Sequence, residues 1–451
     1  MIPVLTPEEM AAVDAAAPES VEVLIERAGA AVAHHALALL GGGYGRRIVV
    51  VVGKGNNGAD GRAAATQLRR RGARVELIDA QAAPSVLPVR DLVIDAAYGT
   101  GVRGAFTAPD PGACPVLAVD IPSGIDGLTG EERGRAMRAT RTVTFAALKP
   151  GLVLEPGRSI AGEVVVADIG LATAAGSVGV VERTDVVEWL PGRPVDAHKW
   201  RAAVLVVAGS LGMTGAAHLA AAAAQRAGAG IVRLDSPGID DDPNRPVEAV
   251  GLALPAAGWA DAVLDASHRV GALVIGPGLG LAASTGVSVH AVLEGARSAV
   301  VVDGDALTLL GTDAVQVLAA RRGPTVLTPH AGELERLLGG PPGADRLSVA
   351  RDLAARAGAV VLLKGPSTVV ADPSGRVRIV TAGDARLATA GTGDVLSGII
   401  GALLACGVAP LESAAAGAWL HARAGARSPA VGLVAGDLVR HLPDALAEVA
   451  G

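Results

Sequence analysis

The stretch RIVVVVGKGNNGADGRAAATQLRRRG, residues 47–72, decides the fold of the first half of the chain. It begins with an unbroken apolar run rich in β-branched residues, which is typical of a strand buried on both faces of a parallel sheet. A glycine-rich turn follows, and then a segment without β-branched runs that favours a helix. The order of strand, glycine turn and helix predicts one unit of an α/β fold.

Similar units continue along the chain on both sides of this stretch. Thr6 and Glu9 fit a capping box at the start of a first helix. Three more strand-like runs follow the quoted stretch, at residues 73–79, 91–101 and 115–124. Strands that alternate with helices predict a parallel, doubly wound sheet, here a Rossmann-like α/β/α sandwich. In such a sheet, ligands bind beyond the carboxyl ends of the strands.

The pattern breaks over VEWLPGRPVDAHK, residues 187–199, which has two prolines and no periodicity. We therefore expect two domains, residues 1–190 and 191–451. A second α/β series begins with AAVLVVAGS at residues 202–210 and closes with GTGDVLSGIIGALLACG at residues 391–407. A chain of 451 residues is long enough for two hydrophobic cores.

The bulk composition excludes several classes of protein. The net charge of −6 argues against a nucleic-acid surface, so no nucleic-acid partner is expected. The only cysteines, Cys114 and Cys406, lie in different halves, which favours a reducing, cytoplasmic setting over a disulfide framework. The N-terminus does not have the pattern of a signal peptide, and the apolar run at residues 395–408 is too short to span a bilayer. No membrane partner is expected.

The first candidate site combines three strand-end loops. Backbone N–H groups of GKGNNGADG, residues 53–61, at a helix N-terminus can bind an anion, although a tight turn without a ligand has the same pattern. Asn56 and Asn57 add amide oxygens that suit a weakly held cation. Asp95 and Asp120 end the next two predicted strands, where they could equally cap their turns.

The strongest motif of the second half is the turn Gly391 to Asp394 before a long apolar helix. Its N–H groups can form an anion hole, and Asp394 can act as a base, whereas capping of the helix by Thr392 and Asp394 is the alternative. Further loops strengthen the first interpretation. Lys364 to Thr368 offers a cation and hydroxyls to phosphate. His330 and Glu333 could bind substrate and magnesium, or merely begin a helix, and one of Asp303 and Asp305 could be a turn residue only.

The first half resembles the NAD(P)H-hydrate epimerase family. The motifs that carry this resemblance are GKGNNGADG, IDAAYGTGVRGA, VLAVDIPSGIDGLTG, TVTFAALKPGL and GEVVVADIG. The resemblance implies that the hydrated dinucleotide is bound by Asn56, Asn57, Gly58, Ala59, Asp60, Gly99, Thr100, Gly101, Val102, Arg103, Gly104, Ala105 and Asp120. It implies a potassium ion at Asn57, Asp95 and Ser123. Asp120 is the candidate acid or base; Lys149 is a second candidate, with an idle, exposed lysine as the alternative. Ala59 replaces the family's usual glycine, a costly change if that position has positive φ.

The second half is similar to the ADP- or ATP-dependent NAD(P)H-hydrate dehydratases, which are ribokinase-like α/β proteins. The motifs are IGPGLG, VVDGDAL, TPHAGELERLL, KGPST and ATAGTGDVLSGII, together with the alanine-rich segment at residues 209–234. The resemblance implies that nucleotide is bound by Lys364, Gly365, Pro366, Ser367, Thr368 and Gly393. It implies that the hydrated dinucleotide is bound by Ala216, Gly280, His330 and Asp394, and Glu333 is the candidate magnesium ligand.

Together the two resemblances imply a bifunctional enzyme that repairs hydrated NADH and NADPH (NADHX and NADPHX). One half epimerises C6 of the damaged ring. The other dehydrates it at the expense of ADP or ATP, with ADP suggested by the fused arrangement; Asp394 acts as the base and a homo-oligomer is an expected state. The main alternative is a ribokinase-like small-molecule kinase whose N-terminal module binds nucleotide without catalysis. A dehydrogenase is disfavoured because the dinucleotide fingerprint is missing.

Overall fold

The computed structural model describes residues 1–101, 104–173, 176–192, 195–196 and 198–450. It divides into two compact units, Ile2–Val178 and the residues from Gly179 onward together with Met1. The division lies before the boundary expected at residue 190, because α6 (Arg183–Trp189) packs against α15 (Pro410–Arg427) of the second unit. Arg183 also donates a hydrogen bond of 2.5 Å to the carbonyl of Glu448.

The first unit is a parallel sheet with flanking helices and short connecting elements. The capping box expected at Thr6 and Glu9 is present at the start of its first helix. Its strands are β1 (Ile2–Pro3), β2 (Arg47–Val52), β3 (Arg74–Asp79), β4 (Leu92–Ala96), β5 (Phe106–Thr107), β6 (Val116–Val119), β7 (Gly134–Arg135), β8 (Arg141–Phe145), β9 (Glu163–Ala167) and β10 (Val178–Val180), the last of which runs into the second unit. Its helices are α1 (Pro7–Ala15), α2 (Val21–Leu40), α3 (Asn56–Arg70), α4 (Pro150–Val153) and α5 (Gly157–Ala161).

The main sheet of this unit has the strand order β3-β2-β4-β6-β8-β9, and every pairing in it is parallel. From β2 the chain first crosses to β3 on one side, and it then returns to β4 on the other side of β2, so the strand order reverses between β2 and β4. Such a switch point opens a crevice at the carboxyl ends of the two strands. The predicted glycine turns after β2 and β4 therefore lie side by side.

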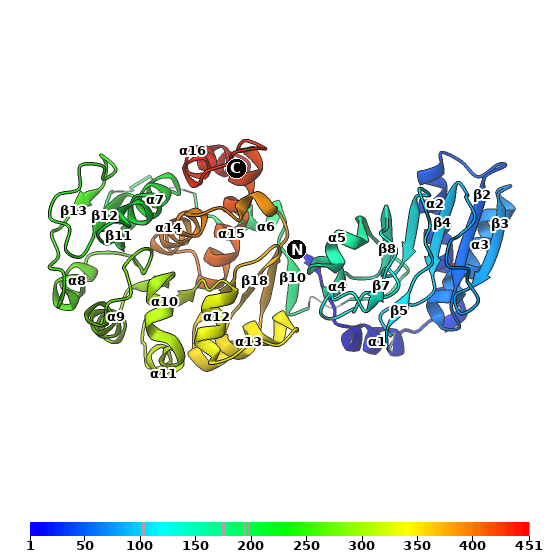
Figure 1. Ribbon diagram of the computed structural model, residues 1–451, viewed down its shortest axis with the longest axis horizontal. Helices are drawn as coiled ribbons and strands as arrows, with labels where there is room; N and C mark the ends of the chain where they lie inside the picture. Colours follow the sequence, from blue (N-terminus) through cyan, green and yellow to red (C-terminus); the bar gives the residue numbers. More distant parts are fainter. Residues whose placement is uncertain (102–103, 174–175, 193–194, 197, 451) are drawn as a thin grey trace. The chain divides into compact units, whose positions relative to one another are not determined.

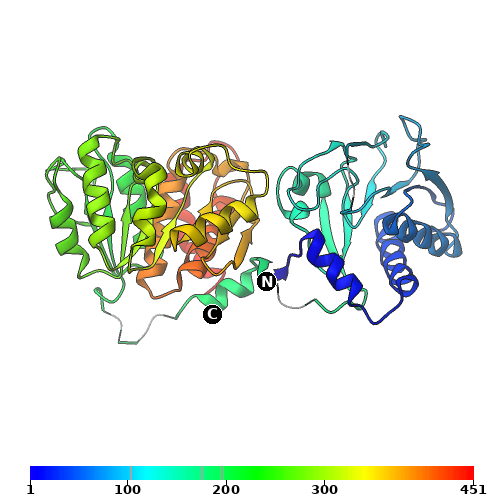
Figure 2. The same cartoon turned by 90° about the horizontal axis from the view of Figure 1, so that it is seen from below.

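Helices α2 and α3 pack against each other (Figure 2) and cover one face of the sheet, where Ile48, Val50 and Ile94 are fully buried. Connecting segments contribute Leu87 and other residues to the opposite face. Among the described residues, α2 is the one helix long and apolar enough to cross a membrane by length and composition. Its buried residues, however, join the hydrophobic core shared with α3, as in an ordinary core helix.

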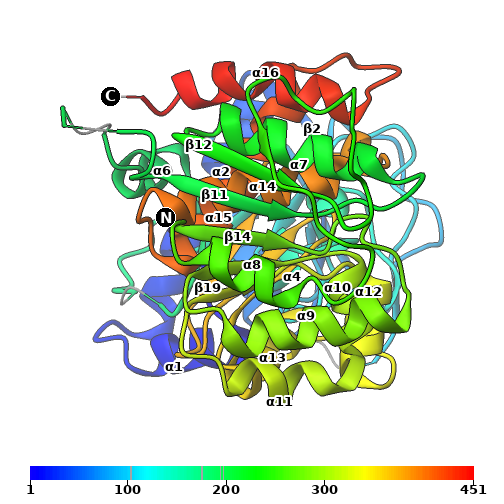
Figure 3. The same ribbon diagram turned by 90° about the vertical axis from the view of Figure 1, so that its left-hand side faces the viewer.

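The second unit has a larger sheet with helices on both faces (Figures 1 and 3). Its strands after β10 are β11 (Ala203–Val207), β12 (Ile231–Asp235), β13 (Val250–Gly251), β14 (Ala272–Ile275), β15 (Ala299–Val302), β16 (Thr325–Leu327), β17 (Val360–Leu363), β18 (Thr368–Ala371) and β19 (Val377–Val380). Its remaining helices are α7 (Thr214–Arg226), α8 (Ala260–Ser267), α9 (Ala283–Gly295), α10 (Asp305–Leu310), α11 (Ala314–Ala319), α12 (Ala331–Leu338), α13 (Arg346–Ala357), α14 (Thr392–Ala405) and α16 (Ala435–Ala447), with 3-10 turns at Gly311–Asp313 and Ala385–Leu387.

Within this unit the strand order is β10-β19-β18-β17-β16-β15-β14-β11-β12-β13. The pairings from β17 through β16, β15, β14, β11 and β12 to β13 are parallel, as the sequence predicts. Strands β17, β18 and β19 instead pair antiparallel, so KGPST is the turn of a hairpin between β17 and β18.

Helix α14 packs against the sheet and against the neighbouring helix α7, and glycines make this close packing feasible. A Cβ built on Gly398 would lie 2.1 Å from the carbonyl oxygen of Ala220 on α7, and one on Gly401 would lie 2.4 Å from Val274 on β14. Because neither neighbour leaves room for a side chain, the helix is held tightly at a fixed depth. The turn that begins α14 is therefore well positioned at the edge of the sheet.

Candidate active sites

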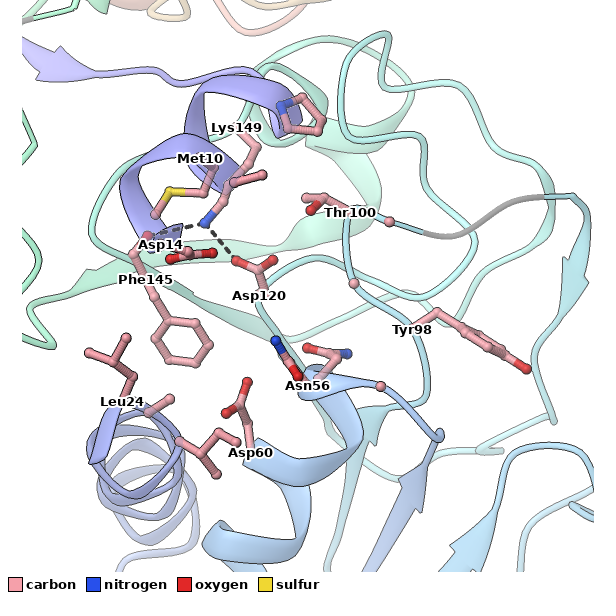
Figure 4. A pocket seen from close by; sticks show the side chains of 18 of the residues that line it. Met10, Asp14, Leu24, Asn56, Asp60, Tyr98, Thr100, Asp120, Phe145 and Lys149 are labelled. Atoms are coloured by element: carbon pink, nitrogen blue, oxygen red, sulfur yellow. Dashed lines mark hydrogen bonds and ion pairs between the residues drawn. The ribbon is translucent and has the colours of Figure 1, made fainter. Parts of the chain in front are cut away.

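A cavity of about 560 Å³ lies at the switch point of the first unit. Figure 4 shows its lining, which comes from α1, α2, the first turn of α3, the turn after β4 and the segment after β6. Among the predicted ligand-binding residues, the cavity is lined by Asn56, Asn57, Asp60, Gly99, Thr100, Gly101 and Asp120. The three predicted loops are thus brought together around one cavity.

Asp120 and Lys149 form an ion pair at the wall of this cavity. Lys149 Nζ donates to Asp120 Oδ1 at 2.6 Å and to the hydroxyl oxygen of Thr144 at 2.8 Å. The alternative of an exposed, idle lysine is wrong, since Lys149 is only 1% exposed. Asp120 has a φ of 64°, a left-handed conformation that is uncommon for a residue with a side chain. Such local strain is found preferentially at functional sites.

Asp60 enters the same cavity from α3, and Asp14 enters it from α1 (Figure 4). Asp60 is 8% exposed. Burial, with smaller contributions from the charges of Asp120 and Asp14, raises the pKa of Asp60 to about 8. Burial also raises the pKa of Asp14. The sequence indicated Asp60 only as a binding residue, and it gave no indication of Asp14.

Of the residues implied for potassium, Asn57 lines the cavity, whereas Asp95 and Ser123 are fully buried and do not line it. Ser123 donates through its backbone N–H and its hydroxyl to the two oxygens of Asp95, at 2.9 and 2.6 Å. Burial raises the pKa of Asp95 despite these bonds. Both polar atoms of the Asn57 side chain are buried and have no hydrogen-bond partner in the part of the chain that the structure describes. Among the described residues, no group of three His, Cys, Asp or Glu side chains could hold a metal ion.

The remaining predicted residues of this site have structural roles or lie apart from the cavity. A Cβ on Gly58 would lie 2.0 Å from the carbonyl oxygen of Gly53, so the turn requires glycine there. Ala59 begins the hydrogen bonding of α3 and has no positive φ, so the expected cost of replacing glycine does not arise. Gly104 and Ala105 do not line the cavity, and residues 102–103 lie outside the described residues.

The second unit places a buried charge cluster under the predicted phosphate-binding turn. Lys364 Nζ donates to Asp303 Oδ1 at 2.8 Å, and Ser397 of α14 donates to Asp303 Oδ2 at 2.6 Å. A Cβ on Gly393 would lie 3.4 Å from Lys364 Nζ. Burial alone would raise the pKa of Asp303, but the Lys364 ammonium holds it below its usual range. Asp303 is therefore more than a turn residue.

Asp394 lies in the first turn of α14, beside this cluster. Burial and the negative charge of Asp303 raise its pKa to about 7, partly offset by Lys364. The capping alternative is wrong: α14 has no side-chain cap, and the Thr392 hydroxyl donates instead to the carbonyls of Leu387 and Thr389. Asp394 is thus oriented by the backbone of its turn and not by a cap.

His330 and Glu333 form the capping box of α12. His330 Nδ1 accepts from the N–H groups of residues 332 and 333, while Glu333 accepts from the backbone N–H of His330 at 2.8 Å. Glu333 Oε2 also lies 3.6 Å from Lys364 Nζ. His330 and Glu333 therefore do begin a helix, as the alternative interpretation predicted. The same arrangement brings the Glu333 carboxylate next to the charge cluster.

Two glycine loops lie beside the start of α7. The hydroxyl of Ser210 donates to the carbonyl of Gly278 at 2.9 Å, and the N–H of Gly280 donates to Asp305 Oδ2 at 2.8 Å. A Cβ on Gly278 would lie 3.0 Å from Ala216. The loop that carries Gly280 thus lies against Ala216 through Gly278, and Asp305 orients this loop.

Sequence reasoning missed two residues that support this site. Arg346 donates to the carbonyls of Leu363 and Lys364 at 3.3 and 3.4 Å, under the turn formed by Gly365, Pro366, Ser367 and Thr368. His421 of α15 is buried, and its Nε2 lies 2.9 Å from the carbonyl oxygen of Thr392. Burial lowers the pKa of His421 to about 4, so the neutral ring donates this bond. Neither residue lies in a recognisable motif.

The fold and the two sites define an α/β enzyme in which a ribokinase-like site is joined to a second, carboxylate-lined pocket. The family model described as NAD(P)H-hydrate dehydratase matches residues 204–447, and the model described as YjeF-related protein N-terminus matches residues 21–86 and 79–151. The chain belongs to the family of bifunctional NAD(P)H-hydrate repair enzymes. The prediction of an epimerase fused to a dehydratase is confirmed, and the small-molecule kinase alternative is not favoured.

Known relatives agree over most of the chain. The bifunctional NAD(P)H-hydrate repair enzyme Nnr of Mycobacterium tuberculosis is 42% identical over 84% of this chain and 82% of its own length. The Escherichia coli enzyme of the same name is 33% identical over 87% and 84%. Among solved structures, the ADP/ATP-dependent NAD(P)H-hydrate dehydratase of Bacillus subtilis, co-crystallised with ATP/Mg2+, is 31% identical and matches 60% of this chain and 98% of its own with a TM-score of 0.52. A ribokinase-like protein of Enterococcus faecalis matches with a TM-score of 0.55 at 26% identity, over 62% of this chain and 99% of its own.

Proposed function

We propose that the cavity of the first unit binds a hydrated nicotinamide dinucleotide and interconverts its C6 epimers. The residues assigned to binding are Asn56, Asn57, Gly58, Ala59, Asp60, Asp120 and the segment 99–105. The observation that best supports this proposal is the ion pair of Asp120 and Lys149, which lies at the wall of the cavity at the switch point of the sheet. The C6 carbinolamine is labile, since its ring nitrogen can expel the hydroxyl, so a positioned proton donor or acceptor is sufficient for catalysis.

The same unit is proposed to bind potassium at Asn57, Asp95 and Ser123. The donor set fits a large, weakly held cation, because it combines a carboxylate, a hydroxyl and an amide oxygen. The Asn57 side chain supports the assignment, because its buried polar atoms have no partner among the described residues and a ligand would satisfy its oxygen. When bound, the cation would balance the buried charge of Asp95 and fix the loops that line the cavity.

The second unit is proposed to bind ADP or ATP through residues 364–368 and Gly393, and the hydrated dinucleotide through Ala216, Gly280, His330 and Asp394. The relative co-crystallised with ATP/Mg2+ supports a nucleotide accompanied by magnesium. Glu333 would hold that magnesium; its carboxylate is buried at the cluster and suits a hard cation. The cation would neutralise charge on the phosphates.

In the dehydration, Asp394 accepts the proton of the C6 hydroxyl, and that oxygen takes the terminal phosphoryl group of the nucleotide. Lys364 and the N–H groups of the Gly391 turn stabilise the charge on the transferred group. Phosphate then leaves C6 with the electron pair of the C6–O bond as the ring nitrogen forms a double bond to C6. Loss of one proton from C5 to solvent then forms the C5–C6 double bond and restores the dihydronicotinamide. The observation that best supports this mechanism is the position of Asp394 at the start of α14, beside the buried Lys364, together with its raised pKa.

The accompanying assignments are NADHX and NADPHX as substrates, ADP as the preferred nucleotide, a homo-oligomeric state and a cytoplasmic location. One assay tests the central proposal. The full chain is incubated with hydrated NADPH and ADP, ATP or no nucleotide, and the reduced-nicotinamide absorbance is followed. We expect absorbance to return only with nucleotide, and to stop at the fraction present as one epimer when Asp120→Asn blocks epimerisation. A stable phosphorylated product without recovered absorbance would contradict dehydration.

A further inference from the structure

The carboxyl group of Asp60 is an exception among the buried acids of the first unit. Asp95 accepts hydrogen bonds from Ser123, and Asp120 accepts from Lys149. Asp60, at 8% exposure, has no hydrogen-bond partner and no ion pair among the described residues. A buried carboxylate without a donor is costly, whereas a neutral carboxylic acid in the same place is not. The environment of Asp60 therefore favours the protonated form.

The surroundings of Asp60 explain this preference. Its charged and titratable neighbours in the cavity are Asp14 from α1, Asp120 after β6, and Lys149, whose ammonium is already engaged by Asp120. Apolar side chains such as Leu24 and Phe145 line the cavity close by (Figure 4). The two neighbouring carboxyl groups and the apolar wall all disfavour a negative charge on Asp60, which is consistent with its pKa of about 8.

We propose that Asp60 is a catalytic proton donor of the epimerase, and that it works with Asp120 as the acceptor. This inference rests on the proposed function of the cavity and assigns a second reacting group to it. Two carboxyl groups held in opposite protonation states can serve as acid and base in one reaction. Asp60 has no hydrogen-bond or ion-pair partner among the described residues, whereas Asp120 forms an ion pair with Lys149.

The step balances as follows. Asp60 gives its proton to the C6 hydroxyl oxygen, the C6–O bond breaks with its electron pair, and water leaves as the ring nitrogen forms a double bond to C6. Water then adds to the other face of C6 and loses one proton to Asp120. The proton passes from Asp120 back to Asp60 through solvent, so the enzyme ends as it began. No oxidant or other reactant is consumed.

The test compares Asp60→Asn with Asp120→Asn and with Asp79→Asn, an exposed control at the end of β3. Exchange between the two epimers of hydrated NADPH is followed by NMR in the full chain, after subtraction of the spontaneous rate. We expect Asp60→Asn to lower the catalysed exchange rate by roughly 100-fold or more, as for loss of a general acid, while the KM changes less than threefold. Urea unfolding of each variant, compared with that of the parent, reports whether its first unit has folded.

A pH profile provides the second readout. The exchange rate of the parent should fall above about pH 8, where Asp60 loses its proton, and this fall should be missing from the residual activity of Asp60→Asn. Exchange at the parent's rate in Asp60→Asn, or a change confined to KM, would overturn the inference. If Asp120→Asn also exchanges at the parent's rate, the proposed function of the cavity fails as well; a loss in Asp120→Asn alone overturns only the role of Asp60.

Discussion

In the first unit Asp60 faces its cavity without a partner, whereas in the second unit Asp303 accepts hydrogen bonds from both Lys364 and Ser397. The first site uses burial to keep a proton on a carboxyl group. The second uses a buried ammonium and the start of a helix, which together favour an anion. The difference matches the reactions proposed for the two sites, since epimerisation moves only protons and water, and dehydration moves a charged phosphoryl group.

The substitution expected to have the largest effect on this contrast is Asp394→Asn. We expect kcat for dehydration to fall by about 1000-fold, because the amide cannot accept the C6 hydroxyl proton. Epimer exchange in the same protein should stay at the parent's rate, because the cavity of the first unit is unchanged. The measurement is nucleotide-dependent return of reduced-nicotinamide absorbance, with Asp352→Asn on the exposed side of α13 as the matched control. Dehydration at the parent's speed would remove Asp394 from the mechanism.

The next effect concerns the stability of the first unit. Because the pKa of Asp60 is raised to about 8, the parent loses stability as the pH rises from about 4, where the unfolded carboxyl ionises, to about 8. Asp60→Asn has no such loss. Relative to the parent, we expect the variant to gain about 5 kcal/mol between pH 4 and pH 9, because the pKa is raised by about four units and each unit is worth about 1.4 kcal/mol. Urea unfolding of both proteins at the two pH values measures this gain; an unchanged difference would show that Asp60 is ionised without cost.

The sequence predicted the strands and loops well because apolar runs and glycine turns are local signals. Residues 47–52, for example, form β2 as expected, and the turn after it meets the one at Gly99. The antiparallel hairpin of β17 and β18 was not predicted, because KGPST has the same composition as a loop between parallel strands. The direction of a strand depends on tertiary pairing, which local sequence does not encode.

The motifs also located the carboxyl groups that are proposed to react, but not their protonation states. Asp60 and Asp394 were identified as ligand-binding residues by their loops, yet their raised pKa values depend on burial and on charges from other elements, such as Asp14 and Asp303. His421 was missed for a related reason. It acts on the Gly391 turn from a helix that follows it in sequence, and a lone histidine in an alanine-rich segment gives no signal of its partner.

His421 gives a prediction of intermediate size. His421→Leu removes the hydrogen bond from the imidazole to the Thr392 carbonyl, which keeps only its bond within α14, at a cost of about 1 kcal/mol to stability. Because the freed turn carries Asp394, we also expect kcat for dehydration to fall by roughly tenfold. His421→Gln, which retains a donor, should recover part of both losses. Unfolding and single-turnover dehydration measure the two effects, and a stability loss without any change in kcat would assign His421 to the core alone.

The smallest expected effect is a shift in a pH profile. With a pKa of about 7 for Asp394, kcat/KM for dehydration should fall as the pH drops below about 7, because the protonated carboxyl cannot act as a base. The negative charge of Asp305 contributes to that raised value, and an asparagine there can still accept from the N–H of Gly280. Asp305→Asn should therefore move the acid limb to lower pH by less than about one unit. The pH dependence of epimer exchange is the internal control, since Asp305 belongs to the second unit. An acid limb that stays in place, or moves to higher pH, would mean that Asp394 does not set it.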